Sequence, residues 1–488
     1  RKESIMDATE KTIFELSANG RKGFRFPSSD VPASDLPESL LRKELPLPEL
    51  SEVDVVRHYT RLSRLNYSLD NGMYPLGSCT MKYNPKICEK AARISAFANL
   101  HPLQPIESVQ GAILILYEMQ IILQEISGFP ACSLTPAAGA QGEFGGVKMI
   151  AASLRDRGET QRKIMLIPDS AHGTNPASSV MSGFECLAVR TDERGNIDLN
   201  DLTSKCNEQL AGIMITNPNT LGLFDENIVE VIRIVHQAGG LVYGDGANMN
   251  ALLGIVKPAE LGFDVMHFNL HKTFATPHGG GGPGAGAICC TEQLKAYLPG
   301  PIADILEEAT EEVPPLYGYR MPEKSIGMLR SFWGHFGIIV RAYCYCMMLG
   351  AEGFRQVAEY ATLNANYLME ALKQDYPLPF DRTCMHEFVL DVKWPDAPGI
   401  RALDVAKRLM DYKFHPPTNY FPLIVHEALM IEPTETESKE TLDDFIKAMK
   451  AIAKEARENP ELLHRAPAET PFGRMDEVKA ARDLKIAE

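Results

Sequence analysis

The sequence predicts an α/β protein with a doubly wound sheet, followed by a smaller α+β domain. Short apolar segments without polar alternation recur between residues 163 and 290, and such segments are typical of strands that are buried on both faces. Helical patterns separate these segments, and the alternation of strands with helices indicates a layered α/β domain. The 488 residues are too many for one ordinary core, so roughly two to three domains are expected.

The elements of the large domain can be predicted in order. A helix is expected from Glu107 to Ser127, because Gly128 and Pro130 follow and would end it. Strands are expected at Lys163–Ile167, Glu185–Val189, Gly212–Thr216, Gly240–Gly244, Val265–Phe268 and Gly286–Cys290. Helices are expected at Gln141–Arg157, Pro176–Met181, Glu226–Gln237 and Leu294–Tyr297.

Five prolines between residues 299 and 322 mark a break before the smaller domain. Beyond it the expected helices are Ile326–Met348, Gly353–Leu372, Leu403–Met410 and Lys439–Arg457, and the expected strands are Glu387–Val392 and Ala428–Glu432. We therefore divide the chain into an N-terminal arm and interface segment (1–85), a large α/β domain (86–320), a small α+β domain (321–460) and a polar tail (461–488), which is expected to be helical in part.

The composition of the chain argues against some kinds of binding partner and indicates a compartment. The net charge of −15 disfavours nucleic acid and anionic membranes, which both attract basic surfaces. We expect no signal peptide and no transmembrane helix, because the most apolar helical stretch, Ala112–Ile126, contains Glu118 and Glu125. The 10 cysteines form no CxxC pair, which predicts a reducing compartment such as the cytoplasm.

Two residues at the ends of neighbouring strands carry the strongest chemical signal. Lys272 follows a short apolar strand and precedes the glycine-rich stretch Gly279–Gly286, so its amine is a candidate for condensation with an aldehyde cofactor. Asp245 ends the preceding apolar strand, where α/β sheets gather ligands. Together they are typical of the lysine and the ring-nitrogen carboxylate of an enzyme that uses pyridoxal 5'-phosphate (PLP).

Other segments complete this site. The small residues of Pro136–Glu143 begin a helix whose free N–H groups could hold a phosphate, although such helix starts are also common as structural turns. His172 follows the strand that ends at Ile167 and could stack on the cofactor ring and carry protons, or could be a capping or core histidine. Thr216 ends a further strand and offers a hydroxyl to the cofactor.

A metal site is not expected. His267 and His271 are four residues apart, but no helix and no third acidic ligand supports a zinc site there. The glycine-rich stretch Gly279–Gly286 precedes a strand instead of following one, which also argues against a dinucleotide fingerprint.

Three long stretches resemble a known family. Tyr74–Asn84, Asn269–Phe274 and Leu429–Glu437 are similar to glycine decarboxylase, the P-protein of the glycine cleavage system. The run from Pro75 to Thr80 is not shared by other PLP enzymes of the same fold. The resemblance extends from about residue 10 to about residue 455 and matches the carboxyl-terminal half of the long single-chain form, as in subunit 2 (the β subunit) of the two-subunit bacterial form.

This resemblance implies a PLP-dependent, fold-type I (aminotransferase-like) architecture and an α subunit as partner in an α2β2 assembly. It implies that Lys272 binds the cofactor covalently, that Asp245 contacts the ring nitrogen and that His172 stacks on the ring. Ala140 and Gln141 would hold the phosphate, His271 would also contact it, and Thr216 would lie near the phenolic oxygen. The run Ser78-Cys79-Thr80 is expected to line the pocket.

The implied activity is that of glycine dehydrogenase (aminomethyl-transferring). Glycine loses carbon dioxide, and its aminomethyl group passes to the lipoyl arm of the H-protein. The residues alone do not separate this reaction from that of an aminotransferase, a cysteine desulfurase or a serine hydroxymethyltransferase. A non-catalytic subunit with the same fold is a further alternative, against which Lys272 and Asp245 argue.

Overall fold

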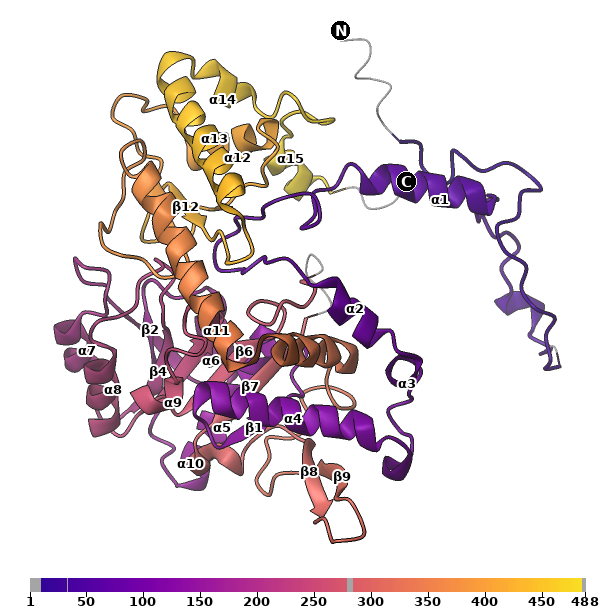
Figure 1. Cartoon of the computed structure of the whole chain (residues 1–488), viewed down its shortest axis with the longest axis horizontal. Coiled ribbons are helices and arrows are strands. Elements are labelled where there is room, and N and C mark those ends of the chain that lie inside the picture. The colour runs from indigo at the N-terminus through magenta and orange to yellow at the C-terminus, as the bar shows by residue number, and fades with distance from the viewer. Residues whose placement is uncertain (1–9, 33, 279–283, 485–488) are drawn as a thin grey trace. The chain divides into compact units, whose positions relative to one another are not determined.

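The computed structural model describes residues 10–32, 34–278 and 284–484 (Figure 1). The chain forms two compact units, Arg1–Gly72 with Ala468–Glu488, and Met73–Pro467. The second unit contains both main sheets and the site described below. Most of the predicted glycine-rich stretch, residues 279–283, lies outside the described residues.

The smaller unit is organised around helix α1 (Glu52–Ser63). A capping box starts this helix, because the Ser51 hydroxyl accepts a hydrogen bond from the Asp54 amide and the Asp54 carboxylate accepts from Ser51. The Glu10 carboxylate contacts both Arg61, at 2.6 Å, and His58, at 3.0 Å, and so ties the start of the described chain to the helix. Helices η1 (Glu38–Leu40) and α15 (Glu477–Arg482) are short.

A seven-stranded sheet forms the centre of the larger unit, with the order β1-β7-β6-β5-β4-β2-β3. Strands β2 to β6 are mutually parallel where they pair, and β7 is antiparallel to both β6 and β1. The strands are β1 (Ala131–Ser133), β2 (Ile164–Pro168), β3 (Glu185–Val189), β4 (Leu210–Thr216), β5 (Leu241–Gly246), β6 (Val265–Asn269) and β7 (Gly286–Cys290). All six predicted strands are present within two residues, whereas β1 was missed because three residues carry too little pattern.

Helices cover both faces of this sheet, as the apolar strands predicted. One core joins the strands to helices α4, α8 and α11, and a second core joins the opposite face to α5 and α10. Successive residues of β2 illustrate the division, since Leu166 belongs to the first core and Met165 to the second. The helices around the sheet are α4 (Gln110–Ser127), α5 (Gly139–Asp156), α6 (Thr174–Met181), α7 (Leu199–Lys205), α8 (Ile228–Gln237), α9 (Pro258–Leu261), α10 (Glu292–Lys295) and α11 (Phe336–Leu372).

Glycines bring α5 unusually close to the sheet. A Cβ atom at Gly146 would lie 2.6 Å from the Tyr243 ring on β5, and one at Gly139 would lie 1.7 Å from Oδ1 of Asn269 on β6. Any side chain at these positions would therefore push the helix away. This close packing places the N-terminus of α5 against the carboxyl ends of β5 and β6.

The prediction for α11 needs a correction at its start. A helix was expected from Ile326, but the observed helix begins at Phe336. Gly327, Phe332 and Gly334 have φ angles of +94°, +61° and +93°, and these left-handed conformations cannot continue a right-handed helix. The two expected helices are joined into one kinked element at Gly350, where φ is +60°.

The smaller sheet has the order β10-β12-β11 and packs against α12, α13 and α14. Its elements are β10 (Phe388–Asp391), β11 (Thr418–Asn419), β12 (Ala428–Ile431), α12 (Ala402–Asp411), α13 (Lys439–Glu458) and α14 (Glu461–Arg465). A hairpin of β8 (Ile302–Glu307) and β9 (Leu316–Arg320) lies where prolines predicted only a break. Helices α2 (Lys86–Ala92) and α3 (Ser95–Ala98) precede α4.

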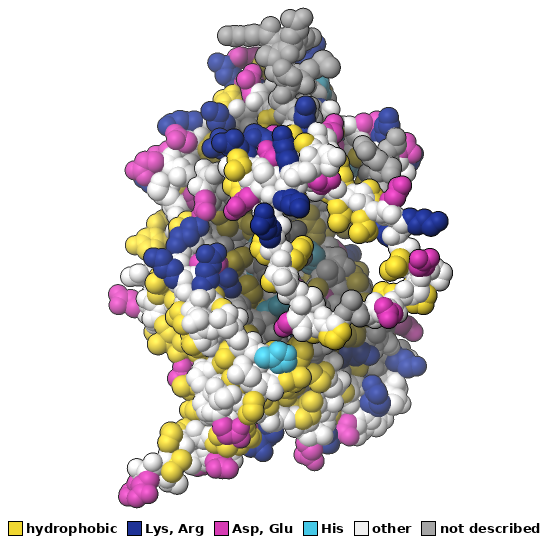
Figure 2. All heavy atoms as spheres, turned by 90° about the vertical axis from the view of Figure 1, so that its right-hand side faces the viewer, with side chains coloured by type: hydrophobic (Ala, Val, Ile, Leu, Met, Phe, Trp, Pro, Cys, Tyr) yellow, Lys and Arg dark blue, Asp and Glu magenta, His cyan; other side chains and the backbone are white. Residues whose placement is uncertain are grey.

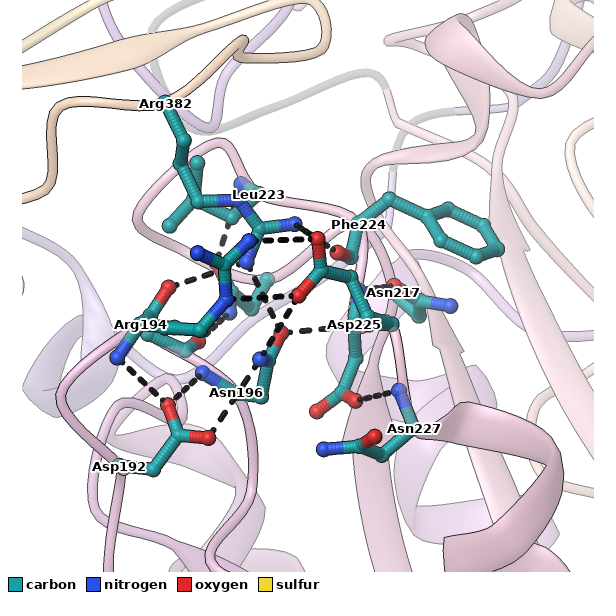
Figure 3. A network of polar contacts seen from close by, with 12 residues as sticks. Asp192, Arg194, Asn196, Asn217, Leu223, Phe224, Asp225, Asn227 and Arg382 are labelled. Atoms are coloured by element: carbon teal, nitrogen blue, oxygen red, sulfur yellow. Dashed lines mark hydrogen bonds and ion pairs between the residues drawn. The ribbon is translucent and has the colours of Figure 1, made fainter.

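A polar network fixes the loop that follows β4 (Figure 3). The Arg382 guanidinium donates to the Asn196 side chain at 3.0 Å and to the Phe224 carbonyl at 2.9 Å. The Asp225 amide donates to Oδ1 of Asn217 at 3.0 Å, and the buried Asp225 carboxylate accepts further backbone N–H groups. These contacts tie the loop after β4 to the segment that precedes β10.

Two surface observations accompany the fold. On the face drawn in Figure 2, basic and acidic side chains lie interspersed among apolar ones. Within the described part of the chain, no helix is both long and apolar enough to span a bilayer.

Candidate functional site

A cavity of about 240 Å³ lies at the carboxyl ends of β4, β5 and β6, beside the N-terminus of α5. This is the edge at which α/β sheets bind ligands. Most of the lining residues are of polar type, and Lys272 and Asp245 are among them. The lining residues are Ser78, Ala138, Gly139, Ala140, Glu143, His172, Thr174, Thr216, Thr220, Asp245, Ala247, Asn248, His267, Asn269, His271 and Lys272.

Asp245 is held at the end of β5 by its neighbours. Its Oδ1 atom accepts a hydrogen bond from the Ala247 amide at 2.9 Å and lies 3.5 Å from Nε2 of His267. His267 stands opposite Asp245 in the register of β5 and β6, and its other ring nitrogen contacts the Tyr243 hydroxyl. Burial lowers the pKa of His267, which favours a neutral ring. His267 therefore lies beside Asp245 as a neutral ring, a neighbour that the sequence reasoning missed.

Lys272 projects into the cavity from the turn after β6. The turn is closed by a hydrogen bond from the Lys272 amide to the Asn269 carbonyl at 3.0 Å. The Lys272 side-chain nitrogen, Nζ, donates to the Ser78 carbonyl at 2.7 Å. The expected pocket segment Ser78-Cys79-Thr80 thus reaches the cavity through Ser78.

His271 also lines the cavity, next to Lys272. Its Nδ1 atom contacts the Ala285 carbonyl at 3.2 Å, which fixes the ring. Burial, with the neighbouring positive charge of Lys272, lowers the pKa of His271 to about 4. The ring is therefore neutral at physiological pH, and Nε2 can accept a hydrogen bond.

The start of α5 forms one wall of the cavity. Ala138, Gly139 and Ala140 line it, and the first N–H groups of a helix have no intrahelical acceptor. The side chain of Gln141 does not line the cavity. It accepts from the Ala137 amide at 2.6 Å and donates to the Leu329 carbonyl at 2.9 Å, so it shapes the helix start instead.

His172 and Thr216 lie on the wall beside α5. Nδ1 of His172 pairs with the Thr174 hydroxyl at 2.9 Å, and burial lowers the pKa of His172. The Thr216 hydroxyl is buried and has no hydrogen-bond partner among the described residues. An orphaned hydroxyl at a cavity wall is costly unless a ligand supplies the partner.

Glu143 is a second buried group with an atom that lacks a hydrogen-bond partner among the described residues, and the sequence reasoning missed this residue. One carboxyl oxygen accepts from the Thr174 hydroxyl at 2.8 Å, while Oε1 is buried without a partner in the described structure. Burial, together with the negative charge of Asp245, raises the pKa of Glu143 to about 7. Near neutral pH this carboxyl therefore holds its proton for a large part of the time.

The raised pKa predicts a pH-dependent stability. Above pH 4.5 an unfolded chain releases this proton, whereas the folded chain keeps it up to about pH 7, so ionisation costs folded stability as the pH rises through this window. Glu143→Gln mimics the protonated form. Relative to the parent chain, the cofactor-free variant should therefore gain unfolding free energy as the pH rises, from little at pH 5 to up to about 3 kcal/mol at pH 8.

Urea unfolding of both proteins at the two pH values measures this difference. Glu185→Gln, at an exposed position of β3, controls for the loss of an acidic side chain. The same stability difference at both pH values would contradict the assigned titration of Glu143.

Two family profiles match the sequence. One, described as the glycine cleavage system P-protein, covers residues 28–316, and the other, described as the glycine dehydrogenase C-terminal domain, covers residues 357–466. A protein described as probable glycine dehydrogenase (decarboxylating) subunit 2 from Caldanaerobacter subterraneus is 55% identical over 481 residues, which are 97% of this chain and 98% of the relative. The protein of the same description from Desulforamulus reducens is 53% identical over 483 residues, with coverages of 97% and 98%.

Solved structures show the same fold. An inhibitor-bound glycine decarboxylase (P-protein) of the glycine cleavage system has a TM-score of 0.69 at 20% identity, over 92% of this chain and 97% of that chain. An apo cysteine desulfurase from Thermococcus onnurineus has a TM-score of 0.60 at 16% identity, over 79% and 95%. At these identities the likeness concerns the fold alone, and it confirms the predicted fold-type I class.

Proposed function

Because the chain belongs to the glycine cleavage system P-protein family, we propose that its cavity binds PLP and glycine and that Lys272 holds the cofactor covalently. The chain is of the subunit 2 type, and its reaction is the decarboxylation of glycine. The predicted family and activity are thereby confirmed. The roles of individual residues are part of the proposal.

The residues of the cavity fit this cofactor. The Lys272 amine and the Asp245 carboxylate come from successive strands and face the same cavity, as binding of an aldehyde and of a pyridine nitrogen requires. The orphaned Thr216 hydroxyl and the orphaned oxygen of Glu143 need a polar ligand there. The small residues Gly139 and Ala140 leave the N-terminus of α5 accessible to a phosphate.

Each side chain then has a separate task. When bound, PLP supplies an aldehyde that captures an amine and a ring that accepts the electron pair left by departing carbon dioxide. Asp245 would hold a proton on the pyridine nitrogen, and the His267 ring lies beside this carboxylate. His172 would lie against the ring and carry a proton to or from the reacting carbon. His271 and the Ala140 amide would bind the phosphate, with the backbone of Gln141 rather than its side chain.

The proposal includes partners and a compartment. Relatives described as subunit 2 imply a subunit 1, with which we propose an α2β2 assembly. The aminomethyl group would pass to the lipoyl arm of the H-protein. All 10 cysteines are free thiols, which supports a reducing compartment such as the cytoplasm.

The observation that carries the proposed site is the meeting of Lys272 and Asp245 in one cavity. Hydride reduction of the PLP-loaded protein, followed by peptide mapping, tests it. The cofactor label is expected on the peptide that contains Lys272. A label on another lysine would overturn the site, and the glycine-dependent exchange of carbon dioxide would still test the reaction independently.

A further inference from the structure

A pair of buried carboxyl groups lies beneath the Ser78–Thr80 loop, outside the cavity lining. Glu387 immediately precedes β10, and Glu432 immediately follows β12. These two residues and His386 are fully buried, and their ligand atoms lie within 4.8 Å of one another. Both ring nitrogens of His386 and Oε1 of Glu432 have no hydrogen-bond partner among the described residues.

The two carboxyl groups hold the loop by its backbone. The Ser78 amide donates to Oε2 of Glu387 at 2.6 Å, and the Thr80 amide donates to Oε2 of Glu432 at 2.9 Å. Ser78 and Thr80 have φ angles of +59° and +44°, a conformation that costs energy for residues with a Cβ atom. The loop therefore depends on these acceptors to keep its shape.

The shape of the loop determines where the Ser78 carbonyl points. That carbonyl accepts the hydrogen bond of 2.7 Å from Nζ of Lys272. Glu387 also accepts from the Asn248 side chain at 3.1 Å, and Asn248 lines the cavity. Glu387 thus fixes the position of the Ser78 carbonyl, which accepts from the Lys272 amine, although Glu387 does not line the cavity.

The hydrogen bonds distribute the charge between the two acids. Glu387 accepts from three donors, namely the Ser78 amide, the Ser78 hydroxyl and Asn248, as an ionised carboxylate does. Glu432 has one oxygen free of donors and can hold a proton there. Burial, together with the neighbouring carboxyl of Glu432, raises the pKa of Glu387 well above its usual range, and burial raises the pKa of Glu432 to about 7, so the pair shares a proton near neutral pH. The three donors on Glu387 favour the charge there, and the oxygen of Glu432 that has no donor favours the proton on Glu432.

The surrounding groups favour a proton over a metal ion at this cluster. Lys82 and Lys272 add positive charge nearby, and the thiols of Cys79 and Cys384 also lie close to the two carboxyl groups. Glu435 is already paired with Lys82 at 2.6 Å. The three donors on Glu387 occupy lone pairs that a cation would need.

We propose that Glu387, ionised, and Glu432, protonated, are positioning residues that hold the Ser78–Thr80 loop so that the Ser78 carbonyl receives the Lys272 amine whenever that amine is not bonded to the cofactor. The proposal rests on the proposed role of Lys272. A fixed acceptor keeps the free amine in the cavity and ready to bond again.

The test compares matched variants of the full chain, prepared with its partner subunit. In Glu387→Gln an amide N–H₂ group faces donors, so in the cofactor-free protein the Ser78 amide should exchange hydrogen about tenfold faster or more, and capture of added PLP by Lys272 should slow by a similar factor. Glu432→Gln imitates a protonated carboxyl and should behave as the parent chain does. Glu432→Ala should speed exchange at Thr80. Asp391→Asn, on β10 but away from the loop, is the control.

Several results would overturn the proposal. One is unchanged exchange and capture in Glu387→Gln, and another is an equal loss in both glutamine variants. A third is a stoichiometric divalent metal in the parent protein that Glu432→Gln removes. If Glu387→Gln does not fold, Ser78→Ala removes the hydroxyl contacts to Glu387 and to the Met430 sulfur but keeps the Ser78 amide bond, and it should slow capture a few-fold. No change in capture would count against the proposal.

Failure of the proposed function looks different. If hydride reduction of the PLP-loaded parent protein leaves Lys272 without the cofactor label, the covalent role proposed for this lysine is wrong. If Lys272 is labelled but its capture rate is the same in the parent protein and in Glu387→Gln, only the positioning role is wrong.

Discussion

Replacing Lys272 by alanine is expected to abolish covalent attachment of PLP and to lower glycine decarboxylation by roughly a thousandfold or more. The reason is that no other amine of the described residues lines the cavity. The fold should persist, because within the described residues the side chain makes a single hydrogen bond, to the Ser78 carbonyl. Absorbance of the bound cofactor and glycine-dependent carbon dioxide exchange measure the two effects.

Two further variants sharpen this test. Lys272→Arg keeps the positive charge but should be equally inactive, because guanidinium does not lose its proton and cannot bond to the aldehyde. Lys295→Ala, at an exposed position in α10, should leave both measurements unchanged. Near-normal turnover of Lys272→Ala would contradict the assignment of this lysine.

Replacing Asp245 by asparagine is expected to lower the rate by about a hundredfold to a thousandfold and to weaken cofactor retention. An amide cannot hold a proton on the pyridine nitrogen as a carboxylate does, so the ring accepts electrons less readily. The rate at saturating PLP and the dissociation constant of PLP separate the two effects. The rate should stay low even when the cofactor is fully bound.

Asp264 provides a matched control for the loss of a buried carboxylate. It precedes β6 at the opposite end of the same strands, where it accepts from the Val242 amide at 2.7 Å. Asp264→Asn should reduce stability without changing cofactor affinity or the rate per loaded site. Equal rates in Asp245→Asn and the parent enzyme would show that Asp245 does not serve the ring nitrogen.

The large sheet could be predicted from the sequence because its strands are continuous apolar segments that are buried on both faces. Lys272 and Asp245 could be found for the same reason, since Asp245 lies near the end of one such strand and Lys272 lies in the turn after the next. Strand β1 was missed because three residues carry too little pattern, and the hairpin of β8 and β9 was missed because its strands are only partly buried and lie among prolines. The late start of α11, at Phe336, depends on left-handed residues before it, one of which, Phe332, is not a glycine.

Other parts of the site depend on contacts between distant segments. Glu143 looks like an ordinary helix residue until Asp245 and the cavity wall are placed around it. Glu387 and Ser78 are 309 positions apart, so no local pattern connects them. Gln141 was placed correctly at the start of α5, but the direction of its side chain follows from Leu329, which lies 188 positions later.

The bridge between Leu76 and Ile431 makes the strand-like segment before Ser78 an extra edge of the smaller sheet. The oxygen that meets the reactive amine is therefore delivered by one sheet, and the amine by another. If each sheet formed without packing against the other, the chain would contain both Lys272 and Ser78, but the two would not meet in one cavity. Cofactor capture is thus a sensitive reporter of the last stage of assembly of this unit.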